Sequence, residues 1–167
     1  VNDYVSNSHK FKYQSLDDAT QLVGYGYFMA KVDLKSAYRS VPISPESKKV
    51  TGFKWTLNGV TAYFVDTKLP FGSMEAPGIF HRLYQAVRRM MARRGFNIVA
   101  YLDDFFICES SKARCRKALS YLIFLLRKLG FYINWKKVVD PTQHLTFLGI
   151  DINSVSMQLS LPENKLL

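Results

Sequence analysis

The chain has 167 residues, of which 48% are hydrophobic and 14% aromatic, so it has the composition of one globular domain and not that of a disordered chain. Its formal net charge of +10, from 23 Lys and Arg against 13 Asp and Glu, favours polyanionic partners, nucleic acid first, although a basic surface can also serve solubility or contact a membrane. Two cysteines, Cys108 and Cys115, and three scattered histidines, His9, His81 and His144, exclude a disulfide framework and a zinc site and indicate a reducing compartment.

The first predicted elements lie before residue 41. Ser15 to Asp18 has a capping serine followed by acids, which is typical of a helix start and predicts a short helix through Val23. The apolar segment from Tyr25 to Val32 predicts a strand that delivers Asp33 at its end. Residues 34–40 are expected to form one or two helical turns before a pair of prolines.

A β-hairpin is predicted next. Val50 to Trp55 and Val60 to Val65 have strand-like composition and flank Asn58-Gly59. That dipeptide between two such runs is a strong hairpin signal, because both residues tolerate the left-handed backbone that the tight turn requires.

Two later segments have the apolar spacing of amphipathic helices. The first runs from Ala76 to Gly95, with an apolar face of Ile79, Phe80, Leu83, Tyr84, Val87, Met90 and Met91. The second ends at Gly130, and its apolar face consists of Cys115, Leu119, Leu122, Leu126 and Leu129. Both stripes are interpreted as core. The longest apolar run, Tyr121 to Leu126, is too short to cross a bilayer, and no signal peptide follows Val1, so we expect a soluble or complexed intracellular chain.

Two adjacent acids, Asp103 and Asp104, lie between the apolar runs 96–100 and 105–108. One interpretation is an ordinary tight turn between two strands, where Asp is common. The other is a metal site, because charge between buried strands is costly unless a cation compensates it. Asp33 would bring a third carboxylate to the same place, and Mg²⁺ prefers a few hard oxygen ligands with open positions for water and phosphate.

The remaining segments 131–134, 145–152 and 155–161 are expected to be short strands, with a hairpin near Asn153-Ser154. The order of helices and strands then predicts an α+β fold with helices packed on one face of an antiparallel sheet, as in ferredoxin-like folds. Acids on the open face of that sheet would be exposed to a substrate. All 167 residues are expected to form one domain.

Five motifs in order resemble the catalytic palm of reverse transcriptases. They are Lys31-Val32-Asp33-Leu34-Lys35-Ser36-Ala37-Tyr38, the segment from Leu69-Pro70-Phe71-Gly72 to Phe80, Tyr101-Leu102-Asp103-Asp104, the segment from Leu129-Gly130-Phe131 to Lys136-Lys137, and Leu145 to Ile150. Five motifs in series are far more specific than any one of them. The resemblance implies an RNA-directed DNA polymerase palm with part of the fingers.

The resemblance implies a metal site made of Asp33, Asp103, Asp104 and the main-chain carbonyl of Leu34. It would hold two Mg²⁺ ions, for which Mn²⁺ is a substitute, and the ions would stabilise the attacking and leaving oxygens of phosphoryl transfer. The attacking group would be the 3′-hydroxyl of a primer on an RNA or DNA template, and the substrates would be deoxynucleoside triphosphates.

Further roles follow from the same resemblance. Tyr38 would exclude the 2′-hydroxyl of a ribonucleotide, and the other substrate-binding positions would be Leu34, Phe71, Gly72, Tyr101 and Leu102. Either Lys136 or Lys137 would protonate the departing pyrophosphate. Each role has a structural alternative. Tyr38 can be a core tyrosine on a short helix, Phe71 and Gly72 can belong to an ordinary loop before a helix, and the two lysines can be a solvated pair of charges.

Nucleic acid would be contacted by Arg82, Arg88 and Arg89, whose helix side also carries Arg93 and Arg94, and by Leu148 and Gly149 of the primer-grip segment. Contacts of this kind position a backbone without reading its sequence. For the arginines, a solvated helix face is the alternative interpretation.

Among subfamilies, the chain resembles retrotransposons of the tyrosine-recombinase (DIRS-like) kind most, and Gypsy-like elements next. Only part of the family's fingers precedes Asp33, and its thumb and RNase H domains are not found, so we expect a fragment of a larger polyprotein whose isolated activity is doubtful. Two alternative functions stay open. The first is a related palm enzyme, either an RNA polymerase, which the bulky Tyr38 disfavours, or a nucleotide cyclase. The second is an inactive nucleic-acid-binding remnant of a retroelement.

Overall fold

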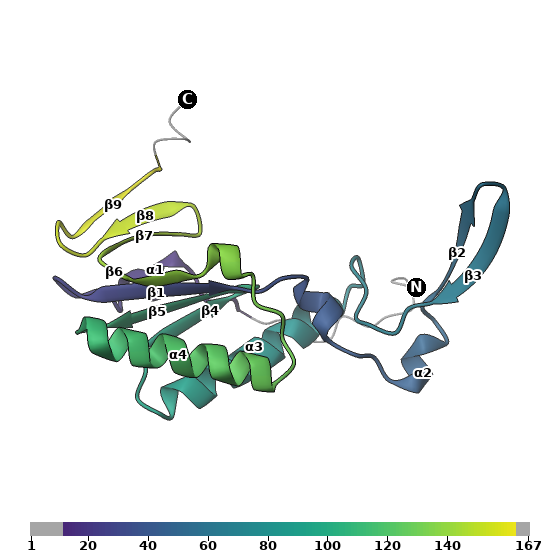
Figure 1. Cartoon of the computed structure of the whole chain (residues 1–167), viewed down its shortest axis with the longest axis horizontal. Coiled ribbons are helices and arrows are strands. Elements are labelled where there is room, and N and C mark those ends of the chain that lie inside the picture. The colour runs from purple at the N-terminus through teal and green to yellow at the C-terminus, as the bar shows by residue number, and fades with distance from the viewer. Residues whose placement is uncertain (1–11, 163–167) are drawn as a thin grey trace.

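The computed structural model describes residues 12–162 and is built around a four-stranded antiparallel sheet (Figure 1). Its strand order is β4-β5-β1-β6. The bounds are Phe28–Asp33 for β1, Ile98–Tyr101 for β4, Asp104–Glu109 for β5 and Val139–Thr142 for β6. The expected α+β architecture is confirmed.

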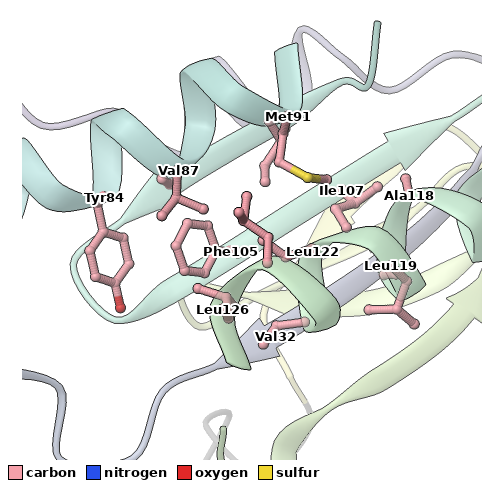
Figure 2. Packing of buried hydrophobic residues seen from close by; sticks show 14 of the residues in the cluster. Val32, Tyr84, Val87, Met91, Phe105, Ile107, Ala118, Leu119, Leu122 and Leu126 are labelled. Carbon is pink, nitrogen blue, oxygen red and sulfur yellow. The ribbon is translucent and has the colours of Figure 1, made fainter. Parts of the chain in front are cut away.

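Two long helices, α3 (Ala76–Ala92) and α4 (Lys112–Lys128), cover one face of this sheet (Figure 1). Figure 2 shows their apolar side chains meeting those of alternate residues of the central strands, such as Val32, Phe105 and Ile107. Successive residues of a strand point to opposite faces. Asp33 and Asp104, one position away from this set, therefore belong to the face opposite the helices.

The opposite face is covered in part by a second sheet and a short helix (Figure 1). Strands β7 (His144–Phe147), β8 (Ile150–Asn153) and β9 (Gln158–Ser160) form the second sheet, and α1 is Leu16–Thr20. A second core joins these layers, in which the Phe106 and Phe147 rings lie 5.0 Å apart.

A separate hairpin projects away from the layered part of the molecule, as Figure 1 shows at the right. It consists of β2 (Gly52–Leu57) and β3 (Val60–Val65), and the short helices η2 (Ala37–Ser40) and α2 (Pro45–Lys48) lie before it in the chain. The turn residues Asn58 and Gly59 both have positive φ, as predicted.

The two faces of this hairpin differ in polarity. Strand alternation and the register place six apolar residues on one face, namely Phe53, Trp55, Leu57, Val60, Ala62 and Phe64, while Val65 belongs to the other face. The other face carries Lys54, Tyr63 and a hydrogen-bonded Thr56–Thr61 pair. Within residues 12–162, most of this apolar face is exposed to solvent.

Several sequence predictions need correction. The first helix ends at Thr20, short of Val23, and residues 131–134 are not a strand, since only Ile133 forms an isolated bridge, to Leu34. The segment 145–152 is two strands divided by a turn at Leu148 and Gly149.

Smaller differences concern burial. Met90 and Leu129, assigned to the core, are 40% and 49% exposed, whereas Asp33, expected on an open face, is only 5% exposed. His9 lies outside the described residues, and no helix within 12–162 has the length and hydropathy to cross a bilayer.

Candidate active site

Asp33 and Asp104 lie side by side at one end of the central sheet. They are directly paired in the antiparallel register of β1 and β5, because one is the last residue of its strand and the other is the first. The turn between β4 and β5 contains Leu102, at φ 47°, and Asp103, whose main-chain oxygen accepts a 2.9 Å hydrogen bond from the Leu34 N–H. The predicted three acids therefore reach the same end of the sheet, with Asp103 exposed at the turn.

The Asp33 carboxylate is held by two side chains from the segment after α4. Asn134 Nδ2 donates to Oδ1 at 3.1 Å, and Lys137 Nζ donates to Oδ2 at 3.1 Å. The hydrogen bond and charge of Asp33 raise the pKa of Lys137, so this lysine stays a cation at the site. Asn134 was not singled out from the sequence, because its nearness to Asp33 depends on a contact across 101 positions of the chain.

Asp104 is the less well compensated of the two paired carboxyls. Burial, opposed by Lys31 and reinforced by the like charges of Asp33 and Asp103, raises the pKa of Asp104 to about 6. Its buried Oδ1 has no hydrogen-bond partner within residues 12–162. The buried hydroxyl of Tyr84 is likewise unpaired in this part of the chain, and the three aspartates contribute to raising its pKa after burial.

This donor set fits a divalent cation. An unpartnered buried carboxylate oxygen, a second carboxylate beside it and a third on the adjoining turn are hard ligands in a site of excess negative charge. In residues 12–162, no three Asp, Glu, His or Cys side chains are gathered closely enough to hold an ion as they stand.

A pocket of about 200 Å³ adjoins these carboxylates. Its lining includes Tyr38, Phe71, Leu102 and Asp103, which places four predicted site residues around one cavity. The Tyr38 ring packs edge-on against Phe71 at 5.1 Å and against Phe80 at 5.1 Å, which fixes its position. Burial, followed by the charge of Asp103, raises the pKa of Tyr38, so its hydroxyl stays protonated.

The other predicted substrate residues, Gly72, Leu34 and Tyr101, lie close in the chain to residues that line this pocket but do not line the pocket themselves. Gly72 follows Phe71 with φ 82°, a backbone conformation that side chains other than glycine rarely adopt. Leu34 is buried behind the acids, and Tyr101 is paired with Asp104 across the hairpin while its ring lies 5.7 Å from Tyr13.

The predicted basic and nucleic-acid residues are more dispersed. Lys136 is exposed on η3 (Trp135–Lys137), and the structure brings only its neighbour Lys137 to Asp33. Arg82 and Arg89 are exposed on α3, and Arg88 donates from Nε to Gln85 Oε1 at 2.8 Å. Leu148 and Gly149 form the β7–β8 turn, both with positive φ.

Comparison with protein families gives one match over most of the chain. The model described as "Reverse transcriptase (RNA-dependent DNA polymerase)" matches residues 3–152. The chain is 30% identical over 135 residues to the Gag-Pol polyprotein of avian reticuloendotheliosis virus, covering 77% of this chain and 12% of that protein. It is 28% identical to the genome polyprotein of petunia vein clearing virus, covering 73% of this chain and 5% of that protein.

Solved structures show the same fold. The foamy viral protease-reverse transcriptase in complex with double-stranded DNA superposes with a TM-score of 0.80 at 23% identity, over 98% of this chain and 27% of that one. The foamy viral enzyme with an RNA/DNA hybrid gives 0.76 at 23% identity, over 92% of this chain and 20% of that one. The chain thus spans about an eighth or less of the two polyproteins cited above.

Proposed function

Because this chain belongs to the reverse transcriptase family, we propose that it is the palm, with part of the fingers, of an RNA-directed DNA polymerase. The single observation that carries this proposal is the pairing of Asp33 with Asp104 beside the Asp103 turn and the Tyr38 pocket. Acids and pocket together can hold a triphosphate and a sugar at one end of the sheet.

The proposed reaction joins a primer 3′-hydroxyl to the α-phosphorus of a deoxynucleoside triphosphate and releases pyrophosphate. Asp33, Asp103, Asp104 and the Leu34 carbonyl would hold divalent ions, Mg²⁺ or Mn²⁺. Such ions, when bound, supply charge stabilisation to the reacting phosphate oxygens. The buried Asp104 oxygen without a hydrogen-bond partner in residues 12–162 supports this assignment, since it is a hard ligand atom that no described side chain occupies.

The chain's own side chains prepare the site in three ways. Asn134 orients the Asp33 carboxylate through one oxygen and leaves the other to Lys137. Lys137 carries a proton at Nζ within the cluster of acids, which suits it to protonate pyrophosphate as it leaves. Lys136, the other candidate for this role, lies on the same short helix, so the nearness of Lys137 to Asp33 favours Lys137.

The pocket would bind the incoming nucleotide and discriminate between deoxyribose and ribose. Tyr38, fixed between Phe71 and Phe80, would leave no room for a 2′-hydroxyl. Phe71 and Leu102, which line the pocket, would complete the substrate-binding surface, together with the predicted positions Gly72 and Tyr101 beside them in the chain. Retention of a deoxynucleotide and rejection of a ribonucleotide would both follow from this shape.

The template and primer would lie across the open end of the sheet. Leu148 and Gly149 would contact the primer, and Arg82, Arg88 and Arg89 would contact phosphates. The two foamy viral neighbours are complexes with double-stranded DNA and with an RNA/DNA hybrid, which supports a duplex partner here. We also place residues 1–167 in one polymerase domain of a larger polyprotein, because the relatives are polyproteins.

The finer assignment is a retroelement of the DIRS-like or Gypsy-like kind. The motif forms Ser15-Leu16-Asp17-Asp18-Ala19 and Leu69-Pro70-Phe71-Gly72 support it. The reaction would proceed inside the cell, in cytoplasm or nucleus, where its deoxynucleotide substrates are present.

Primer extension by the full-length protein tests the proposal. We expect Mg²⁺-dependent extension of a primer on an RNA template with deoxynucleotides, and a loss of at least a thousandfold in Asp103→Asn, which keeps the shape of the side chain but removes its charge. Extension that survives this substitution would contradict the proposal. Extension that prefers ribonucleotides would instead support a palm RNA polymerase, and duplex binding without extension would support an inactive remnant.

A further inference from the structure

A second cavity, of about 420 Å³, adjoins the Tyr38 pocket. Ser36 lines both cavities, so it is a shared wall between them. This residue has φ 51° and directly precedes η2, the short helix that follows the end of β1. The second cavity therefore lies directly beside the proposed reaction site without including its aspartates, Tyr38 or Phe71.

Main-chain hydrogen bonds fix the two walls of this cavity. One wall is the segment after Asp33, and the other is the segment from Phe131 to Trp135. The Lys35 N–H donates to the Tyr132 carbonyl at 2.8 Å, and Leu34 and Ile133 form an antiparallel bridge. A cavity whose walls are joined in this way is preformed, so a ligand does not have to order it on binding.

The lining is cationic. Lys35 and Arg127 are exposed, form no ion pair within residues 12–162, and face a cavity without an acidic residue in its lining. Arg39 also lines it, but Asp66 binds Arg39 at 2.5 Å, so we assign it no ligand. Two cations that line one cavity and form no ion pair in residues 12–162 favour a phosphate-bearing ligand.

The same cavity presents aromatic surface. Tyr132 and Trp135 are 67% and 58% exposed, and neither ring stacks on another ring in the described part of the chain. Exposed rings next to free cations are the combination with which proteins bind nucleotides, through stacking of the base and ion pairing of the phosphates.

We propose that this cavity binds a nucleotide other than the one being incorporated, with its base on Tyr132 or Trp135 and its phosphates on Lys35 and Arg127. The ligand chemistry has two sources, a free nucleoside triphosphate or one nucleotide of a single strand. The site would act whether or not the adjoining aspartates catalyse extension.

Tryptophan fluorescence can detect this binding directly, since Trp55 and Trp135 are the two tryptophans of the sequence. The Trp55→Phe variant of the 167-residue chain leaves Trp135 as the only fluorescent tryptophan. ATP, or separately a dT8 oligonucleotide, is titrated into this variant in a buffer that contains EDTA. EDTA removes divalent ions and thereby weakens triphosphate binding at the aspartates. We expect saturable quenching, weakened about tenfold by Arg127→Ala and less than twofold by Lys128→Ala.

Lys128 is a matched control, because it is the next residue on α4, has the same charge and does not line the cavity. Quenching by ATP alone identifies a free nucleotide as the ligand, and quenching by dT8 alone identifies a strand. The proposal is overturned if neither probe quenches, if Lys128→Ala weakens binding as much as Arg127→Ala, or if Tyr38→Ala abolishes it. Loss of extension in Asp103→Asn is measured separately, so failure of the polymerase proposal is distinguishable from failure of this one.

Discussion

Asp33 and Asp104 are paired on the neighbouring strands β1 and β5, but their carboxylates have different hydrogen-bond partners. Asp33 receives Asn134 and Lys137, whereas Asp104 keeps one buried oxygen without a partner in the described residues. Asp104 is therefore a partly buried carboxyl whose ionised form lacks a full set of hydrogen-bond partners in the described residues. Burial, reinforced by the charges of Asp33 and Asp103, raises its pKa to about 6, above an ordinary value of 3.8.

We expect Asp104→Asn to stabilise the metal-free chain at pH 8 and to have little effect at pH 4. A carboxyl with a raised pKa in the folded state favours folding when protonated and loses that contribution as the pH rises through about 6. After a discount for partial exposure, the gain at pH 8 is about 1 to 2 kcal/mol. Thermal unfolding in EDTA across pH 4 to 8 measures it.

The exposed neighbour supplies the control. Asp103→Asn removes the same charge at the turn, but its carboxylate is solvated and its stabilisation should stay within about 0.5 kcal/mol. Equal stabilisation by both substitutions, or a gain from Asp104→Asn that does not shrink below pH 6, would show that the Asp104 carboxyl is not the strained group.

Tyr38 is the residue whose shape decides the sugar in the proposed reaction. We expect Tyr38→Ala to raise the incorporation of ribonucleotides relative to deoxynucleotides by tenfold or more, because the ring between Phe71 and Phe80 would be replaced by space. Steady-state incorporation of both nucleotides by the full-length protein measures the ratio.

Tyr38→Phe is the matched variant, since it keeps the ring and removes the hydroxyl. Discrimination should remain within about twofold of the unmodified protein if exclusion is steric. A loss of discrimination in Tyr38→Phe as large as in Tyr38→Ala would assign the effect to the hydroxyl and contradict the steric argument.

Among the elements, the β7–β9 sheet depends on a small core beneath it. Phe147 is fully buried and its ring lies 5.0 Å from that of Phe106 on the central sheet. We expect Phe147→Ala to lower the free energy of unfolding by about 3 to 5 kcal/mol, because it leaves a cavity between the two sheets. Denaturant unfolding of the 167-residue chain measures this loss.

Two further variants keep this measurement interpretable. Phe147→Leu restores much of the volume and should cost less than Phe147→Ala. Leu159→Ala on β9 removes a 54% exposed side chain and should change stability by less than about 0.5 kcal/mol. A small effect of Phe147→Ala would mean that the second sheet is held by its hydrogen bonds and not by this packing.

The elements also show what the sequence could predict. The Asn58-Gly59 hairpin and both long helices carry strong local signals and are confirmed. Strand β6 is not among the predicted strands; it contains Pro141, which a strand tolerates here because β6 is at the edge of the sheet. Residues 131–134 look like a strand, but their main-chain hydrogen bonds are divided among Leu126 of α4, Asp33 at the end of β1 and Lys35 beyond it, and only Ile133 forms an isolated bridge.

The site was predictable to the extent that its residues lie in local motifs. Asp33, Asp103, Tyr38 and Phe71 were named from the sequence, and the structure brings them to one end of the sheet. Their roles stay predictions. Asn134 could not be found in this way, since only the fold places it beside Asp33, and no spacing in the sequence distinguishes Lys137 from Lys136.

At the scale of the whole molecule, the positive charge is unevenly distributed. The helices α3 and α4 have 17 residues each, and neither contains an acidic residue. We expect duplex binding by the chain to weaken steeply with salt, and Arg82→Ala with Arg89→Ala to reduce the slope of log K against log salt by about 2, one per lost phosphate contact. Fluorescence anisotropy with a labelled duplex from 50 to 300 mM salt measures the slope.

Arg116 offers a comparison outside the predicted contacts. It lies on α4 and pairs with Asp140 at 3.6 Å, so Arg116→Ala should leave the slope nearly unchanged. A fall of the slope by the same amount for each arginine removed, whether from α3 or at Arg116, would mean that binding depends on the total charge of the chain. In that case the assigned α3 contacts are wrong.

The projecting β2–β3 hairpin limits the solubility of this 167-residue chain. Its six-residue apolar face, with Trp55 at the middle, has no covering layer within residues 12–162. Preparations will therefore become turbid as concentration rises, and mild detergent will clear them, while the layered body remains folded. Crystallisation and calorimetry of this segment accordingly need dilute conditions or a lysine in place of Trp55.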